Sequence, residues 1–187
     1  MKLMIVRHGE TIENKKRIWQ GRLHGTLSEE GVIQARKLAL RFSEENLDYI
    51  YSSDLRRALN TAKEIAKYHP NIPFYTNEKI REASFGNLEG EFISETNINL
   101  ESSGIESIES MQKRARSFIK MLKKYPENST IMVVGHGMIN RAITSILLDK
   151  SYKEIPHYYN AGVSIFEIKK KKNPVMYLFN CTEHLTV

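Results

Sequence analysis

Two histidines stand directly after short apolar runs and could share one pocket. One residue separates His8 from the Leu-Met-Ile-Val run of residues 3–6. One residue likewise separates His136 from the Ile-Met-Val-Val run of residues 131–134. Such runs are typical of buried strands. Because ligands of open α/β sheets bind beyond the carboxyl ends of the strands, we expect both histidines to face the same site.

The neighbours of His8 favour phosphoryl chemistry, although a lone histidine is more often structural. Arg7 precedes it and offers a planar guanidinium that suits phosphate oxygens. Gly9 follows it and would allow a ligand to approach the backbone closely. Nearby arginines also disfavour the imidazolium form, which leaves the ring neutral and nucleophilic. We therefore expect His8 to attack a phosphoryl group.

A second cationic site is expected where a predicted strand meets a predicted helix. Arg56 and Arg57 lie there, and helix N-termini attract anions. Both arginines lie off the apolar stripe of Leu55, Ala58 and Leu59, so helical spacing does not choose between them. The alternative is that both are solvated surface side chains.

Glu82 could serve as a general acid, although by itself it is an ordinary surface carboxylate. Beside a phosphorylated substrate it could protonate the leaving oxygen. His8, His136 and Glu82 could in principle bind zinc. However, two histidines with arginines nearby suit an anion, and no His-x-x-x-His spacing occurs in the chain. We expect neither a metal nor a cofactor.

Strand-like and helix-like segments alternate along the chain. Strands are expected at residues 3–6, 49–52, 72–75, 131–134, 163–168 and 175–179. Helices are expected to begin near Ser28 and Asp54, to span about 107–124, and to follow the strand at 131–134. This order predicts an α/β three-layer sandwich, with a mostly parallel sheet between helices on both faces and a terminal hairpin. We expect one domain over residues 1–187, with a short lid-like excursion over the site at 83–104.

The composition argues against several classes of protein. The chain has 187 residues, of which 41% are hydrophobic and 27% are charged, as in ordinary globular domains. Cys181 is the only cysteine, and no apolar run approaches a membrane span, so we expect a cytoplasmic protein without a membrane partner. Part of the net charge of +6 lies in Lys169–Lys172. No aromatic residues interleave with these lysines, so we interpret the run as a solvated turn and expect no nucleic-acid partner.

Taken in order, the motifs of the chain resemble those of the histidine phosphatase superfamily, also called the phosphoglycerate mutase-like family. The matching blocks are Arg7-His8-Gly9-Glu10-Thr11 with Asn14, Gln20-Gly21 with Leu27-Ser28-Glu29-Glu30-Gly31, Ser53-Asp54-Leu55-Arg56-Arg57-Ala58 with Thr61-Ala62, Arg81-Glu82 with Phe85-Gly86 and Glu89-Gly90, and Val134-Gly135-His136-Gly137. The resemblance covers nearly the whole chain.

The resemblance implies a mechanism and a role for each motif residue. His8 would be the nucleophile that becomes phosphohistidine. Glu82 would protonate the leaving group and then act as base for the hydrolytic water. The remaining site residues would be Arg7, Arg57 and His136 on the phosphoryl oxygens, with Asn14, Gln20 and the backbone at Gly137 assisting. Such a site suits phosphoryl transfer, which depends on positioning and charge neutralisation.

The chain departs from the family pattern at three places. Leu88 stands where an aromatic residue is common, His24 stands where an acidic residue is common, and the polar segment 91–103 is short. Mutases of the family resemble longer chains, so the resemblance favours a metal-independent phosphomonoesterase acting on a small phosphorylated metabolite, with α-ribazole phosphate one candidate. The alternative is a phosphoglycerate mutase. A non-catalytic phosphate-binding protein would be expected to lack His8 or Glu82.

Overall fold

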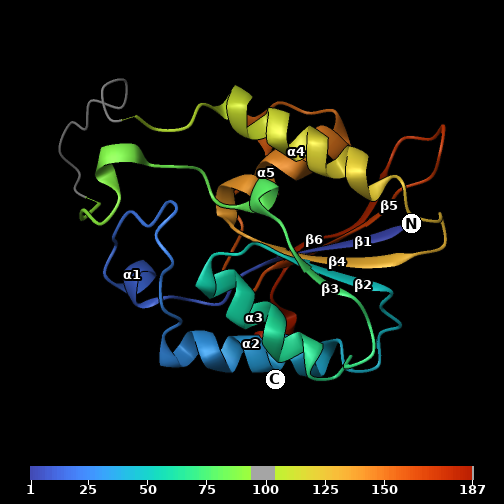
Figure 1. The fold of residues 1–187 in the computed structure, drawn as a ribbon, viewed down its shortest axis with the longest axis horizontal. Coiled ribbons are helices and arrows are strands. Elements are labelled where there is room, and N and C mark those ends of the chain that lie inside the picture. Colours follow the sequence, from blue (N-terminus) through green and yellow to red (C-terminus); the bar gives the residue numbers. More distant parts are fainter. Residues whose placement is uncertain (94–103, 187) are drawn as a thin grey trace.

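A six-stranded sheet forms the centre of the computed structural model, which describes residues 1–93 and 104–186 (Figure 1). The strands are β1 (Lys2–Arg7), β2 (Tyr49–Ser52), β3 (Phe74–Thr76), β4 (Thr130–Gly135), β5 (Val163–Glu167) and β6 (Val175–Cys181). They are arranged in the order β3-β2-β4-β1-β5-β6. The first four of these are parallel, whereas β5 runs antiparallel to both β1 and β6. The mostly parallel sheet and the terminal hairpin predicted from the sequence are thus confirmed.

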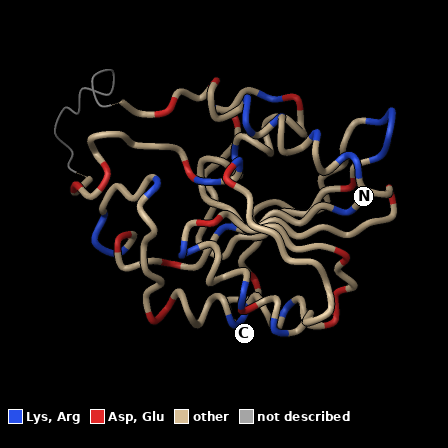
Figure 2. The backbone as a smooth tube through the Cα atoms, in the orientation of Figure 1, with Lys and Arg blue, Asp and Glu red and all other residues tan. Residues whose placement is uncertain are grey.

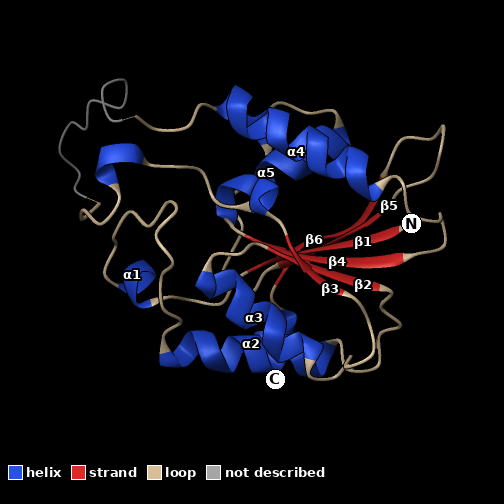
Figure 3. Cartoon of the chain, viewed as in Figure 1, coloured by secondary structure: helices blue, strands red, loops and turns tan. Residues whose placement is uncertain are grey.

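Helices cover both faces of the sheet (Figure 3). The helices are α1 (Ile12–Lys15), α2 (Glu29–Arg41), α3 (Arg56–Ala66), α4 (Ile108–Leu122) and α5 (Gly137–Leu148). Successive strand residues point to opposite faces. Leu3 and Ile5 of β1 accordingly join the core under α4 and α5, whereas Met4 and Val6 join the core under α2 and α3. The three-layer architecture expected from the sequence is therefore confirmed.

Predicted boundaries shift by up to about two residues, and the shifts at the starts of α3 and β3 have a local cause. Asp54 does not cap α3, because its carboxylate accepts hydrogen bonds from Arg81 Nε at 2.8 and 3.0 Å. The helix therefore begins at Arg56, without a side-chain cap. Strand β3 begins at Phe74 rather than residue 72, since Pro73 has no N–H to donate to the ladder. The carbonyl oxygen of Pro73 still accepts a hydrogen bond from Ile50 N at 3.0 Å.

The excursion expected over the site is described only in part. Residues 83–93 and 104 belong to the described structure, and residues 94–103 lie outside it. The interpretation of 91–103 as a short lid therefore falls mostly on residues outside the described part. Within the described ranges, none of the helices combines the length and the apolarity needed to cross a membrane.

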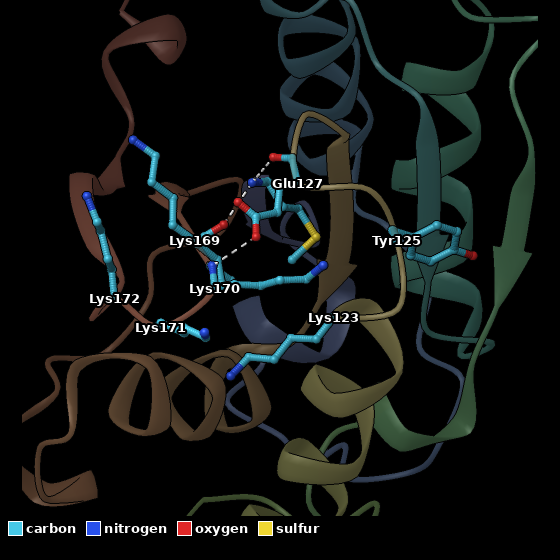
Figure 4. A pocket seen from close by; sticks show the side chains of 9 residues that line it. Lys123, Tyr125, Glu127, Lys169, Lys170, Lys171 and Lys172 are labelled. Atoms are coloured by element: carbon cyan, nitrogen blue, oxygen red, sulfur yellow. Dashed lines mark hydrogen bonds between the residues drawn. The ribbon is translucent and has the colours of Figure 1, made fainter.

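The lysine run forms the exposed turn between β5 and β6, as the sequence predicts. Figure 2 shows its positive charges at the end of the molecule where β1 begins. A cavity of about 380 Å³ lies beside this turn. In Figure 4, Lys123 and Lys171 point toward one another across this cavity, whereas Lys169 and Lys172 point away from it. The carboxyl ends of the parallel strands lie at the opposite end of the sheet.

Candidate active site

The carboxyl ends of β1 and β4 bring His8 and His136 together. The two strands are parallel neighbours with Arg7 opposite Gly135, and His8 N donates to Gly135 O at 3.1 Å. The imidazole centroids are 5.1 Å apart, and both side chains are buried. The two strand ends therefore place the two histidines side by side.

Hydrogen bonds at the two rings determine their tautomers. His8 Nδ1 lies 2.7 Å from Gly9 O, which can only accept, so Nδ1 carries the proton and Nε2 keeps its lone pair. Arg57 Nε can only donate, and it lies 3.1 Å from His136 Nδ1. His136 therefore carries its proton on Nε2. One ring thus offers a nucleophilic nitrogen, and the other offers a donor.

Arg57, and not Arg56, lies beside the two histidines. Arg57 is 1% exposed and Arg56 is exposed to solvent. Arg57 Nε also lies 3.2 Å from His8 Nε2, so its charge stands between the two histidines. Its terminal nitrogens donate to loop carbonyls, among them Gly21 O at 2.8 Å. Arg57 therefore supplies charge and one N–H to the histidines, while its fork holds the loop of residues 21–24.

Three buried donors of the described residues at this site have no partner. The two nearest His8 are Arg7 Nε and His136 Nε2, and the third is Trp19 Nε1. Arg7 Nη1 is held by Tyr158 O at 2.6 Å, which fixes the guanidinium in place. An unsatisfied buried donor costs about 1–3 kcal/mol, and more when it is charged. An anion that accepts from Arg7 Nε and His136 Nε2 would remove this cost, so the geometry suits a phosphoryl group.

Glu82 borders the same space and caps the start of α5. Its carboxylate accepts from Met138 N at 3.1 Å, Ile139 N at 3.2 Å and Ala83 N at 3.0 Å. A Cβ atom built on Gly137 would lie 3.6 Å from Glu82 Oε2 and 3.7 Å from Arg7 Cζ. The carboxylate, the guanidinium and the helix start therefore meet at Gly137. This arrangement places a proton-transfer group beside the buried donors.

Burial and like charges keep the imidazoles neutral. Burial, followed by the charges of Arg57 and Arg7, lowers the pKa of His8 well below its usual range. Burial and Arg57 likewise lower the pKa of His136 well below its usual range. Burial lowers the pKa of Arg57 to about 10, which still leaves it charged at neutral pH. The site therefore combines neutral histidines with fixed cations, as the residues around His8 suggested.

All but one of the predicted site residues line one cavity of about 300 Å³. They are Arg7, His8, Asn14, Gln20, Arg57, Glu82 and Gly137. His136 is fully buried beside Arg57 and His8 and is not among the residues that line the cavity. Within the described residues, no three histidine, cysteine, aspartate or glutamate side chains gather in a group that could hold a metal ion.

Backbone packing, rather than the approach of a ligand, requires a glycine at position 9. A Cβ atom at this position would lie 2.4 Å from Gly31 O, so the glycine is required by backbone packing against α2. Gly9 is absent from the residues that line the cavity. Its N–H donates to Thr61 Oγ1 at 3.1 Å, which ties the catalytic strand end to α3. The expectation that Gly9 makes room for a ligand is not supported.

Two supporting residues, Asn160 and Asn140, lie outside the set of predicted site residues. Asn160 Nδ2 donates to His8 O at 3.2 Å and to Asn14 Oδ1 at 3.3 Å. Asn140 Nδ2 donates to Val6 O at 3.1 Å and so joins α5 to β1. Asn160 lies far from His8 in the chain, so only its position just before an apolar strand could have drawn attention to it. Asn140 shows a clearer signal, because it is a buried polar residue in an apolar helix.

Comparisons with known proteins agree with this geometry. The model of the histidine phosphatase superfamily (branch 1) matches residues 3–182. The chain is 32% identical to phosphoserine phosphatase 1 of Hydrogenobacter thermophilus over 201 residues, which cover 99% of this chain and 94% of the relative. A structure of phosphoserine phosphatase from Entamoeba histolytica in complex with 3-phosphoglyceric acid is 33% identical, with a TM-score of 0.84 and 98% of each chain covered. Bacillus stearothermophilus YhfR is 25% identical, with a TM-score of 0.88 over 98% of each chain.

Proposed function

The chain belongs to branch 1 of the histidine phosphatase superfamily and is a phosphoric monoester hydrolase, and from this premise we propose that it acts through a phosphohistidine on His8. The observation that carries the proposal is the placement of two buried donors without partners, Arg7 Nε and His136 Nε2, beside the His8 ring. The hydrogen bond from His8 Nδ1 to Gly9 O leaves Nε2 as the attacking atom. A nucleophile and donors for the phosphoryl oxygens thus lie together.

In the first step, the lone pair of His8 Nε2 forms the N–P bond as the P–O bond to the alcohol breaks. Glu82, protonated at this stage, gives its proton to the departing oxygen. The ring then carries a proton on Nδ1 and the phosphoryl group on Nε2, and Gly9 O stabilises the resulting positive charge. Arg7 and His136 donate to the phosphoryl oxygens, where negative charge must be held in the transition state.

In the second step, water attacks phosphorus and gives a proton to the Glu82 carboxylate. The N–P bond breaks, its electron pair returns to Nε2, and inorganic phosphate leaves. Glu82 is again protonated, so the cycle closes without any other reactant. Two guanidinium groups, Arg7 and Arg57, supply the positive charge that a metallophosphatase takes from metal ions.

We propose that the partner is a small phosphorylated metabolite rather than a nucleic acid or a membrane. The cavity of about 300 Å³ is large enough for a small phosphate monoester. The relative from Hydrogenobacter thermophilus is named for phosphoserine, which is a molecule of this size. Cytoplasmic location stays a prediction from the sequence.

The decisive experiment traps the intermediate. Rapid quenching in alkali with a ³²P-labelled substrate should leave label on the peptide that contains His8, and the label should be lost in acid. His24→Ala is the matched control, because His24 is an exposed histidine on the neighbouring loop, and its labelling should be normal. Hydrolysis of a chiral thiophosphate ester should proceed with retention at phosphorus, since two displacements occur. Inversion, or label on an acid-stable residue, would rule out the phosphohistidine.

A further inference from the structure

One wall of the catalytic cavity is apolar. The apolar or largely apolar side chains of its lining are Ile18, Trp19, Phe85, Ile93 and Met138. The rings of Trp19 and Phe85 meet edge to face, with their centroids 4.7 Å apart. We call these five side chains the apolar wall. When the phosphoryl group of a substrate lies at His8, these side chains are the apolar surface available to its alcohol part.

Backbone hydrogen bonds fix the apolar wall in place. Trp19 N donates to Glu91 O at 2.9 Å, Gly90 N donates to Trp19 O at 2.8 Å, and Ile93 N donates to Arg17 O at 2.6 Å. Segment 17–19 and segment 90–93 therefore form a short ladder. A wall that is already ordered costs little entropy when it binds a substrate.

A carboxylate clips the two loops of this wall together. Glu89 Oε1 accepts from Arg22 N at 3.0 Å and from Phe85 N at 2.9 Å. A Cβ atom at Gly21 would lie 2.2 Å from the same oxygen, so the loop of residues 20–22 packs closely on Glu89. Hydrogen bonds of the main chain therefore fix the backbone positions of Trp19 and Phe85.

Among the described residues, the charged groups of the cavity leave none for the alcohol part of a substrate. The titratable residues that line it are Arg7, His8, Arg57, Glu82, His157 and Tyr158, and burial raises the pKa of Tyr158 to about 12. The first four act on the phosphoryl group under the proposed function. Burial, followed by the charges of Arg141 and Arg7, lowers the pKa of His157, which favours its neutral form.

We propose that the site selects phosphate monoesters of uncharged alcohols that carry an aromatic or bulky aliphatic group. Esters whose alcohol part bears a carboxylate or an ammonium group, such as phosphoserine, are disfavoured because no described charged group of the cavity is free to pair with these charges. The inference rests on the proposed function, since it requires the phosphoryl group to lie against His8. It separates this chain from relatives that are named for phosphoserine.

The test compares 2-phenylethyl phosphate, n-propyl phosphate and phosphoserine. All three are esters of primary alcohols, so differences in kcat/KM report recognition of the alcohol part more than leaving-group chemistry. We expect kcat/KM for the phenylethyl ester to exceed that for phosphoserine by about 10- to 100-fold, with the propyl ester between them. Equal or better hydrolysis of phosphoserine would overturn the inference and leave the phosphatase function intact. If none of the three is hydrolysed, the proposed function fails with it.

Substitutions in the apolar wall test whether it determines the preference for esters of aromatic alcohols. Phe85→Ala should lower the phenylethyl-to-propyl ratio of kcat/KM about 10-fold, chiefly through KM, and Phe85→Leu should restore most of the ratio. Ile18→Lys should raise the phosphoserine-to-phenylethyl ratio by placing a cation on the wall. Tyr177→Ala, on the exposed face of β6, is the matched aromatic control and should leave all ratios unchanged. Unchanged ratios in both Phe85 and Ile18 variants would contradict the assignment of the wall.

Discussion

Two cation-rich cavities lie at opposite ends of the same sheet, and they differ in how their cations are held. At the carboxyl end of β1, Arg57 is 1% exposed and Arg7 is held by Tyr158 O. At the start of β1, the larger cavity of about 380 Å³ is bordered by Lys123 and by the exposed lysine turn (Figure 4). The catalytic cavity is the smaller of the two, so neither size nor the number of charges distinguishes the site.

The difference lies in burial and in unmet hydrogen bonds. The lysines of the turn are in water, where screening makes each charge worth little. Lys169 already pairs with Glu167 at 2.9 Å, and Lys123 is the C-cap residue of α4, where a cation complements the helix dipole. The donors beside His8 are buried and lack partners in the described structure. An anion is therefore needed at one end of the sheet and only tolerated at the other.

The strongest way to break this comparison is His8→Ala. Loss of the attacking nitrogen should lower kcat by about 10⁴-fold or more, because no other described side chain takes over the N–P bond. His8→Asn, which fills more of the buried space, should be equally inactive and guards against loss of the fold. Phosphate release and thermal unfolding are measured on both variants. Substantial turnover in either folded protein would refute the role of His8.

Next comes Arg7→Lys, which keeps the charge but loses the planar N–H groups. We expect kcat to fall about 10²-fold, since one preorganised donor to the transition state is lost. The matched exchange at the other cavity, Lys171→Arg, also keeps the charge and should leave kcat within about twofold. Steady-state kinetics of both variants decide the point. Similar effects from both exchanges would mean that charge alone matters.

Glu82→Gln tests proton transfer and should be selective between substrates. Hydrolysis of n-propyl phosphate should slow by about 10²-fold, because its alkoxide needs a proton, whereas 4-nitrophenyl phosphate should lose much less. Equal losses would move the acid elsewhere, with Glu10, Glu78 and Glu89 as the next candidates. The contacts argue against two of these, since Glu10 Oε1 accepts from Ser28 Oγ at 2.6 Å and Glu89 clips the two loops of the apolar wall.

Buried neutral histidines also predict a pH dependence of stability. The folded state lowers the pKa of His8 and His136 below the unfolded value of about 6.5, so the unfolded state binds more protons below that pH. Stability is therefore lost as pH falls through about 6.5, by about 1.4 kcal/mol per pH unit for each histidine that stays neutral. Urea unfolding between pH 7 and 5 measures the slope. His8→Asn should flatten it, and an unchanged slope would mean that His8 titrates normally.

The smallest effect is expected at the lysine turn. Lys170→Gln combined with Lys171→Gln should change kcat/KM and the midpoint of thermal unfolding very little, with kinetics within about twofold of the parent. A loss of activity comparable to that of Arg7→Lys would show that the second cavity takes part in function. The comparison between the two ends of the sheet would then fail.

The sequence by itself predicted the six strands and, of the described α-helices, all but the four-residue α1, in their correct order. Alternation of short apolar runs with helical stripes is a local property, and it placed the strands and helices to within about two residues. It also delivered His8 and His136 to strand ends, because the end of an apolar run marks where a strand leaves the core. The lysine run could likewise be recognised as an exposed turn from its own composition.

Only the tertiary structure decided how the site residues act. Arg56 and Arg57 look alike on the helix, and contacts with His8 and the loop of residues 21–24 chose between them. Packing against Gly31, rather than a ligand, explains Gly9. Glu82 meets the start of α5 only after the chain has folded. Such choices depend on atoms from distant segments, so burial, tautomer and hydrogen-bond partner cannot be inferred from local spacing.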